Sequence, residues 1–277
     1  MPTKMKFFFL IIPLIIMSGC NGGKMEEKGI SFSSLKDVSV SQLDELSKKR
    51  IYFGHMSVGY NIIDGIRDIL KENPELKMNI IETKDPSAMA PHVFAHSSVG
   101  KNMDPKSKVD DFVQSMESGL GQKVDAAFFK FCFVDIEAAT NVEELFSLYK
   151  NAMSKLQGKY PKVTFIHVTV PLTTVQTGWK APVKRIIGKP IEGYQDNIKR
   201  NQFNDLIRQE YSGREPVFDL AGIESSALDG RRASFTSNDK IYCSLMPSYT
   251  YDGGHLNEKG RKVVAEQLLI LLATVSK

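Results

Sequence analysis

The 277-residue chain has few cysteines and little net charge. Its three cysteines, Cys20, Cys132 and Cys243, are too few for a disulfide-rich scaffold and are not spaced like the ligands of a metal site. The 36 basic residues exceed the 32 acidic ones by only four, whereas nucleic-acid-binding proteins usually carry a clustered basic face. We therefore expect no nucleic-acid partner. Cys132 and Cys243 could either pair in an oxidising compartment or remain buried thiols.

The sequence also lacks repeats, low-complexity segments and a long apolar run at its start. The apolar stretch from Phe7 to Met17 is shorter than the roughly 20 residues of a membrane-spanning helix. It follows Lys4 and Lys6 and precedes small residues, which is the pattern of an export signal. Residues 1–19 are therefore predicted to be a signal peptide. Its removal takes away two lysines and leaves 34 basic against 32 acidic residues.

The four residues MSGC, which end at Cys20, resemble a bacterial lipobox, in which the cysteine becomes the lipidated first residue. This resemblance implies a membrane anchor at Cys20; an ordinary signal peptide, or an uncleaved anchor with an incidental cysteine, is the alternative. Asn21 rather than Asp follows Cys20, which in Gram-negative lipoproteins usually accompanies sorting to the outer membrane. The protein is thus expected in the cell envelope, facing the periplasm or the surface.

Residues 20–45 are polar and contain Gly and Ser before they become amphipathic, so we expect a tether that leads into a first short helix. The remaining residues, 46–277, are enough for one large domain with a substantial core.

Strand-like and helix-like segments alternate through this domain, as in a parallel sheet with helices on both faces. The fold class predicted is α/β, with about five parallel strands. The expected strands cover residues 51–53, 78–82, 126–132, 163–170 and 216–221. Helical spacing of apolar residues marks 60–73, 142–160 and 194–211, and a last helix is expected after Asn257 as its N-cap.

Two long stretches, residues 84–107 and 222–254, show neither pattern and are expected to be irregular. In open α/β sheets the binding site lies outside the carboxyl ends of the strands, where both stretches would sit. The segment after Phe53 would lie there as well.

The segment after Phe53 reads GHMSVG, and it joins an expected strand to an expected helix. Ser57 would stand in this turn with its side chain toward the crevice, and the free N–H groups of the helix start could stabilise an oxyanion. A serine before a helix is more often only an N-cap, so this stretch alone favours a capping role.

A second motif, DGGH, places Asp252 three residues before His255 in a loop that enters the last helix. A serine needs a base to take its proton, and the base needs a partner that fixes its tautomer. Asp252 and His255 could supply both. The two motifs together therefore favour Ser57 as a nucleophile.

These residues resemble the SGNH or GDSL-type hydrolases, whose first block puts a catalytic serine after the first strand and whose last block is Asp-x-x-His before the final helix. The likeness covers residues 48–277 and includes VTFIHVTVPLTT and PVFDLA. It implies a flavodoxin-like, three-layer α/β/α fold and ester chemistry. It also implies Ser57 as nucleophile, His255 as general base and acid, and Asp252 as the residue that orients His255. No cofactor or metal is expected.

The sequence departs from this family at the first and third blocks. His55 and Met56 stand between Gly54 and Ser57, where the family has one residue, and the oxyanion asparagine of the third block has no counterpart.

The resemblance suggests several substitutes for the missing donor. Gly100 is the best match to the second-block glycine, with Asn102 as a side-chain donor, and Lys130 or His96 could also contribute. Asp135 is expected in the neighbourhood of the third block, but a carboxylate cannot itself stabilise an oxyanion. His55 and Tyr251 are further candidates for contacts with substrate, Tyr251 by stacking on a sugar ring.

Three functions fit the sequence. The first is an ester hydrolase that acts on acyl groups, acetyl groups in particular, of a carbohydrate or envelope component. The second is an O-acetyltransferase that modifies an envelope or exported polysaccharide, because both reactions share the acyl-enzyme. The third, suggested by the altered blocks, is a glycan-binding or scaffold protein on a decayed hydrolase fold.

Overall fold

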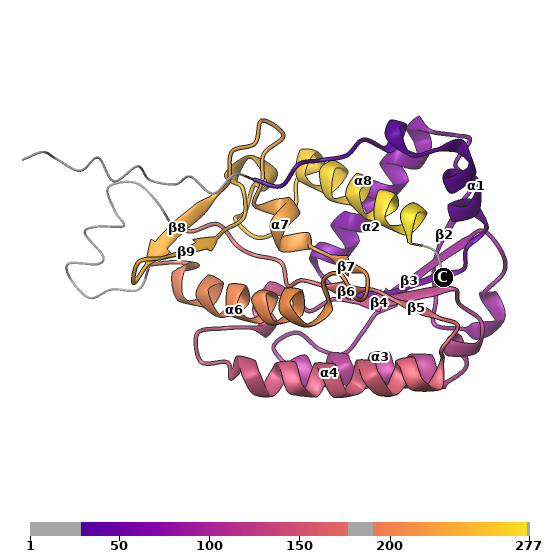
Figure 1. Ribbon diagram of the computed structural model, residues 1–277, viewed down its shortest axis with the longest axis horizontal. Helices are drawn as coiled ribbons and strands as arrows, with labels where there is room; N and C mark the ends of the chain where they lie inside the picture. The colour runs from indigo at the N-terminus through magenta and orange to yellow at the C-terminus, as the bar shows by residue number, and fades with distance from the viewer. Residues whose placement is uncertain (1–28, 177–190, 276–277) are drawn as a thin grey trace, which may run out of the picture.

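A computed structural model describes residues 29–176 and 191–275 (Figure 1). The predicted signal peptide and Cys20 lie outside these residues. Within them, no helix is both long and apolar enough to span a bilayer.

The centre of the fold is a five-stranded sheet in which all neighbouring strands are parallel. The α/β class and the parallel sheet predicted from the sequence are thereby confirmed. In spatial order, the strands are β2 (Asn79–Glu82), β3 (Val93–Ser98), β1 (Ile51–His55), β4 (Ala126–Phe129) and β5 (Thr164–Phe165).

The strand β3 corrects the prediction that residues 84–107 are irregular. Its second half, His96 to Ser98, is polar and therefore has no apolar strand pattern. Two of these polar groups are nonetheless buried and bonded to β1, since Ser97 lies 2.8 Å from the Tyr52 hydroxyl and His96 lies 3.1 Å from His55. The strand beside β1 is thus β3, and the predicted strand 78–82 forms the edge of the sheet as β2.

The expected strand 163–170 is divided into β5 and β6 (His167–Val168), and only two residues of 216–221 form β7 (Val217–Phe218). Strands β6 and β7 pair in parallel and make a separate two-stranded sheet. Similarly, β4 ends at Phe129 rather than at residue 132. If the edge strand β2 is set aside, the strand order is β3, β1, β4, then the divided strand β5 and β6, and finally β7. This is the flavodoxin-like order.

Helices cover both faces of the sheet and give three layers (Figure 1). One face packs against α2 (Val58–Glu72), α7 (Leu220–Glu224) and α8 (Glu258–Thr274), and the other against α3 (Pro105–Glu117), α4 (Val142–Lys159) and α6 (Tyr194–Tyr211). The helices predicted at 60–73, 142–160 and 194–211 are present, and Asn257 caps α8 through its side chain, as predicted.

The sheet separates two apolar cores because side chains alternate along its strands. On β1, Ile51 and Phe53 belong to the core under α2 and α8, whereas Tyr52 belongs to the core over α3 and α4. A one-residue shift of β1 would reverse these faces, so the register also fixes where the segment after β1 points.

The second stretch expected to be irregular, 222–254, contains regular structure as well. Strands β8 (Ser234–Ser237) and β9 (Lys240–Cys243) form an antiparallel hairpin beside α6 (Figure 1). The rings of Phe235 and Tyr194 lie 4.9 Å apart and join this hairpin to the start of α6.

The described part of the predicted tether, residues 29–45, lies against the domain. It contains a single helical turn, η1 (Leu35–Asp37), and most of α1 (Val40–Lys48). Leu35 is buried in the core, and its N–H donates to Glu266 on α8 at 2.9 Å.

Candidate active site

Ser57 stands at the carboxyl edge of the sheet, between the end of β1 and the start of α2. Its backbone has φ 54° and ψ −115°, a region that residues with a side chain rarely occupy. Gly59 makes this sharp turn possible, because a Cβ there would lie 2.4 Å from atoms of His55. The Ser57 hydroxyl makes no capping hydrogen bond to α2. The capping role considered from the sequence is therefore not what this side chain does.

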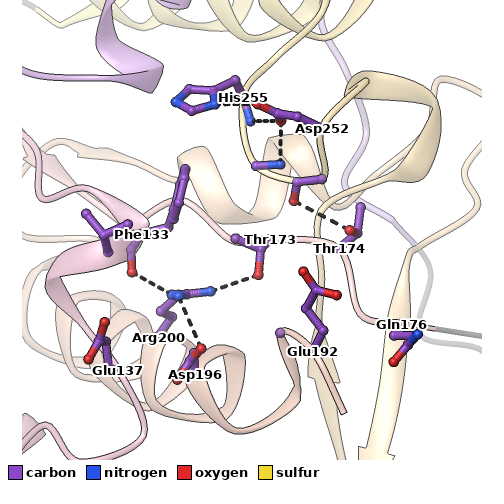
Figure 2. A pocket seen from close by; sticks show the side chains of 14 residues that line it. Phe133, Glu137, Thr173, Thr174, Gln176, Glu192, Asp196, Arg200, Asp252 and His255 are labelled. Atoms are coloured by element: carbon purple, nitrogen blue, oxygen red, sulfur yellow. Dashed lines mark hydrogen bonds and ion pairs between the residues drawn. The ribbon is translucent and has the colours of Figure 1, made fainter. Parts of the chain in front are cut away.

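The Ser57 hydroxyl instead meets the loop before α8. Ser57 Oγ lies 2.7 Å from His255 Nε2, and His255 Nδ1 lies 2.6 Å from Asp252 Oδ2. Figure 2 shows the His255 ring beside the Asp252 carboxylate. The structure thus brings together three side chains, from two segments about two hundred residues apart, in the order that a nucleophile, its base and an orienting carboxylate require.

The Asp252 carboxylate is fixed by the loop that contains it. Its Oδ1 accepts hydrogen bonds from the N–H groups of Gly254 and His255, at 2.9 and 2.8 Å. Partial desolvation acts to raise the pKa of Asp252, but these bonds and His255 outweigh it and hold the pKa well below its ordinary value. Asp252 is therefore a carboxylate at neutral pH and can accept the Nδ1 proton of His255.

His255 is held from two further sides. The Phe133 ring packs edge-on against the imidazole, with 5.5 Å between centroids. The N–H of the next residue, Leu256, donates to Asn61 on α2 at 3.1 Å. The imidazole is thus confined between the serine, the carboxylate and an aromatic wall, while its side chain remains 46% exposed toward the open side of the site.

The Gly100 N–H was expected to donate to the oxyanion, but it is not free to do so. Its N–H donates to the Asp111 carboxylate at 2.7 Å, and a Cβ at residue 100 would collide with the backbone of α3. The prediction of Gly100 as an oxyanion donor is therefore corrected, because that donor is already used inside the fold.

Asn102, in the same loop, has a different environment. Its side chain is exposed, and its Oδ1 accepts a hydrogen bond of 2.9 Å from Lys108 Nζ. Lys108 is fully buried and also pairs with Asp135 at 2.6 Å. Because an ammonium group only donates, it fixes the amide oxygen toward itself and turns the Asn102 Nδ2 away.

Asp135 connects this loop to the turn after β4. Its carboxylate accepts from the N–H groups of Met103 at 2.9 Å and Cys132 at 2.6 Å. The Cys132 thiol in turn donates to the carbonyl of Met56, the residue before Ser57, at 3.5 Å. Val99 N–H donates to the carbonyl of His55. The loop that carries Asn102 is therefore anchored to the turn that contains Ser57 through β3 and β4, the two strands beside β1.

His55 does not contact the open site. It is the last residue of β1 rather than part of the turn, and it is completely buried. Burial, with the nearby charge of Lys130, lowers the pKa of His55 to about 2, so the ring is neutral. The prediction that His55 contacts substrate is corrected. This chain has one residue more between Gly54 and Ser57 than the first block of the family. Because His55 belongs to β1, only Met56 lies in the turn before Ser57.

Lys130 and His96, which the sequence also offered for the oxyanion hole, are both buried. Lys130 Nζ donates to the carbonyl of Phe131 and contacts the Cys132 thiol. By contrast, Tyr251 is 83% exposed beside Asp252, and its hydroxyl donates to Glu258 at 2.9 Å. Cys132 and Cys243 are both buried thiols, one of the two states considered from the sequence.

A cavity of about 620 Å³ opens on the His255 side of the site (Figure 2). Its walls are the turn after β4, the segment after β6, the start of α6 and the loop before α8. The lining residues are Phe133, Val134, Glu137, Thr173, Thr174, Gln176, Glu192, Gly193, Asp196, Arg200, Asp252, Gly253, Gly254 and His255.

Lys108 and most residues of this cavity were not identified from the sequence. Lys108 did leave a signal, because it shares the buried face of α3 with Val109, Phe112 and Met116. A lysine at such a position needs a partner, which here is Asp135. In the described ranges, no group of three or more His, Cys, Asp or Glu side chains gathers into a metal-binding arrangement.

Comparison with known proteins gives a likeness at the level of structure. No protein-family model matches the chain. No curated protein matches it either. A putative GDSL-like lipase from Parabacteroides merdae superposes with a TM-score of 0.51 at 12% identity, over 81% of this chain and 96% of that one. A putative platelet activating factor from Streptococcus pneumonia has a TM-score of 0.48 at 14% identity, over 84% and 91% of the two chains. The first of these two superpositions shows that the chain has the α/β fold of a GDSL-like lipase, as the sequence resemblance implied.

Proposed function

We propose that the protein is a serine ester hydrolase that cleaves acyl esters, acetyl esters above all, of a carbohydrate or other envelope component. The observation that carries the proposal is the hydrogen-bonded series from Ser57 through His255 to Asp252 at the carboxyl edge of the sheet, next to an open cavity. The strained backbone at Ser57 supports it, since such strain is concentrated at functional sites.

The reaction follows from the donor and acceptor roles of these groups. His255 Nε2 takes the hydroxyl proton as Ser57 Oγ bonds to the ester carbonyl carbon, and Asp252 stabilises the imidazolium. When the tetrahedral intermediate collapses, the C–O bond to the alcohol breaks and His255 returns the proton to the leaving oxygen. A water molecule, deprotonated by His255, then attacks the acyl-enzyme and releases the acid and free Ser57.

The developing oxyanion needs hydrogen-bond donors. We assign the side-chain donor to Asn102 Nδ2, in place of the third-block asparagine that this chain lacks. The N–H of Gly59 is already bonded to the Met56 carbonyl. We assign the backbone donor to the N–H groups of Ser57 and Val58, which come before Gly59 at the start of α2. The buried Lys108 ammonium neutralises Asp135, whose charge would otherwise oppose an oxyanion nearby.

The location of the enzyme is part of the same proposal. The lipobox-like MSGC would tether the domain to a bacterial membrane through Cys20. Radiolabelled palmitate incorporation in cells that express the full chain, compared with the Cys20→Ala variant, tests this part separately. Equal labelling of both would contradict the anchor.

Hydrolysis of p-nitrophenyl acetate by the purified domain tests the chemistry. The Ser57→Ala variant is expected to lose turnover by at least about a thousandfold, with an unchanged circular dichroism spectrum. Ser248→Ala, which alters an exposed serine outside the triad, is the matched control and is expected to retain activity. Full activity in Ser57→Ala would refute the assignment.

Hydrolysis and acyl transfer pass through the same acyl-enzyme, so product analysis separates them. With an acetylated donor and a sugar acceptor present, a hydrolase releases only acetate and leaves the acceptor mass unchanged. An acceptor heavier by one acetyl group in mass spectrometry would make the protein an O-acetyltransferase. No acyl-enzyme with any donor would favour a decayed scaffold.

A further inference from the structure

We propose that the cavity beside His255 is the subsite for the alcohol part of the ester, and that it selects uncharged or amino-bearing sugars over anionic ones. This inference rests on the proposed ester chemistry and deepens it by naming the substrate class. The cavity volume of about 620 Å³ is far larger than an acetyl group requires and lies in the usual range for ligand pockets. His255, which returns the proton to the leaving alcohol, lines it.

The walls of the cavity are tied to one another. Asp196, in the first turn of α6, accepts a hydrogen bond of 2.9 Å from the N–H of Ala138, beyond the turn after β4. Thr174 N–H donates to the carbonyl of Gly253, in the catalytic loop, at 2.8 Å. Gly193, with φ 72°, allows α6 to begin directly against Thr174, since a Cβ there would lie 2.2 Å from the Thr174 carbonyl. The cavity is therefore a preformed part of the fold.

Among the lining residues that the structure describes, carboxylates outnumber positive groups. Four of its lining residues are carboxylates, Glu137, Glu192, Asp196 and Asp252, whereas Arg200 supplies the one guanidinium among the lining residues. Figure 2 shows Glu137, Asp196 and Glu192 around Arg200. Carboxylate oxygens accept hydrogen bonds from hydroxyl or ammonium groups and repel another carboxylate or a sulfate.

Arg200 is engaged by the walls and does not make the cavity an anion site. It is buried, and its Nε donates to the carbonyls of Phe133 and Ile136 at 2.9 and 3.2 Å. Its Nη1 donates to Thr173 and Asn197, both at 2.9 Å. The remaining Nη2 lies 3.8 Å from the Asp196 carboxylate. The guanidinium thus braces the turn that holds Phe133 against His255.

Two other features fit a sugar ring. The hydroxyls of Thr173 and Thr174 line the cavity beside the carboxylates. The Thr174 hydroxyl donates to the Gly253 carbonyl at 3.5 Å, so its oxygen can still accept a hydrogen bond from a sugar hydroxyl. The Phe133 ring, edge-on to His255, offers an apolar surface at the catalytic end.

The test compares three monoacetylated methyl glycosides that differ in one group, a glucoside, a cationic glucosaminide and an anionic glucuronide. At low salt, kcat/KM is expected to be at least about tenfold higher for the first two than for the glucuronide. The Glu137→Gln/Glu192→Gln variant is expected to reduce this ratio several-fold, mainly through KM of the glucuronide. Glu143→Gln, which removes an exposed carboxylate on α4 outside the cavity, should keep the ratio of the unaltered protein.

Hydrolysis of p-nitrophenyl acetate is measured in parallel, because it separates this inference from the proposed function. If the unaltered protein does not cleave p-nitrophenyl acetate or any glycoside, the ester chemistry itself has failed. If it cleaves p-nitrophenyl acetate but treats the three glycosides alike, or prefers the glucuronide, only the subsite inference is overturned. A ratio that the double variant leaves unchanged would overturn it as well.

Discussion

Lys108 Nζ lies 2.9 Å from Asn102 Oδ1, so a fully buried ammonium fixes the amide of an exposed asparagine in the loop beside the candidate nucleophile. The same ammonium pairs with Asp135 at 2.6 Å. The hydrolases that the sequence resembles carry an asparagine at the end of the third strand, which this chain lacks. In the proposed site, Asn102 takes the place of that donor from a different loop.

The first prediction concerns Asn102. Asn102→Ala should lower kcat for p-nitrophenyl acetate by about 10²- to 10³-fold with little change in KM, because the amide acts on the transition state rather than on the bound ester. Steady-state kinetics measure this effect. Asn151→Ala, an exposed asparagine on α4, is the matched control. A kcat for Asn102→Ala within twofold of the original would remove Asn102 from the oxyanion hole.

The second prediction concerns the pair of Lys108 and Asp135, whose side chains are both fully buried. Lys108→Met leaves the Asp135 carboxylate without its partner and should lower the free energy of unfolding by about 3–5 kcal/mol. Lys108→Met/Asp135→Asn removes both charges and should recover most of that loss. Urea unfolding of Lys108→Met, Asp135→Asn and the double variant measures this; a loss in the double variant equal to the sum of the two single losses would show that the pair is not coupled.

The third prediction concerns strain at Ser57. Because φ is 54° there, glycine adopts the native backbone more easily than alanine does. Ser57→Gly should therefore be about 1 kcal/mol more stable than Ser57→Ala, despite the greater flexibility of glycine in the unfolded chain. Thermal or urea unfolding of the two inactive variants gives the comparison. A less stable glycine variant would mean that the turn stores no strain.

The fourth prediction concerns Glu224, which is completely buried on α7. Burial raises its pKa from 4.5 to about 8, although Leu172 N–H donates to its carboxyl group. The folded state therefore binds this proton more tightly than the unfolded state does. The resulting stability is complete below pH 4.5, falls as the pH rises toward 8, and is gone above it, a total of roughly 3–5 kcal/mol.

Glu224→Gln keeps the size and an acceptor for Leu172 but does not titrate. Urea unfolding at pH 5, 7 and 9 should show a free energy of unfolding that falls with pH in the original protein. The slope should be clearly smaller in Glu224→Gln. Parallel pH profiles for the two proteins would contradict the raised pKa.

Local sequence patterns were sufficient for much of this fold. The apolar spacing of α6 and the side chain of Asn257 before α8 predicted those helices directly. The strand β3 was not predicted because the buried side chains of His96 and Ser97 bond to β1 across the sheet, and a local sequence pattern does not show such contacts.

The candidate site, too, could be predicted from the sequence only in part. Asp252 and His255 lie three residues apart in one loop, so their pairing could be predicted from the sequence. Two other contacts depend on how α3 packs against its neighbours. They are the hydrogen bond from the Gly100 N–H to Asp111 and the one from Lys108 to Asn102. Such tertiary contacts decide which donors remain available, and the sequence does not encode them locally.

The proposed chemistry depends on Ser57 as a nucleophile that His255 activates. Labelling with a fluorophosphonate, followed by peptide mass spectrometry, measures this reactivity at the residue itself. We expect one adduct, on Ser57, that is absent from Ser57→Ala and strongly reduced in His255→Ala. A folded protein that takes up no label, or takes it up on another serine with Ser57 unmodified, would show that Ser57 is not the nucleophile.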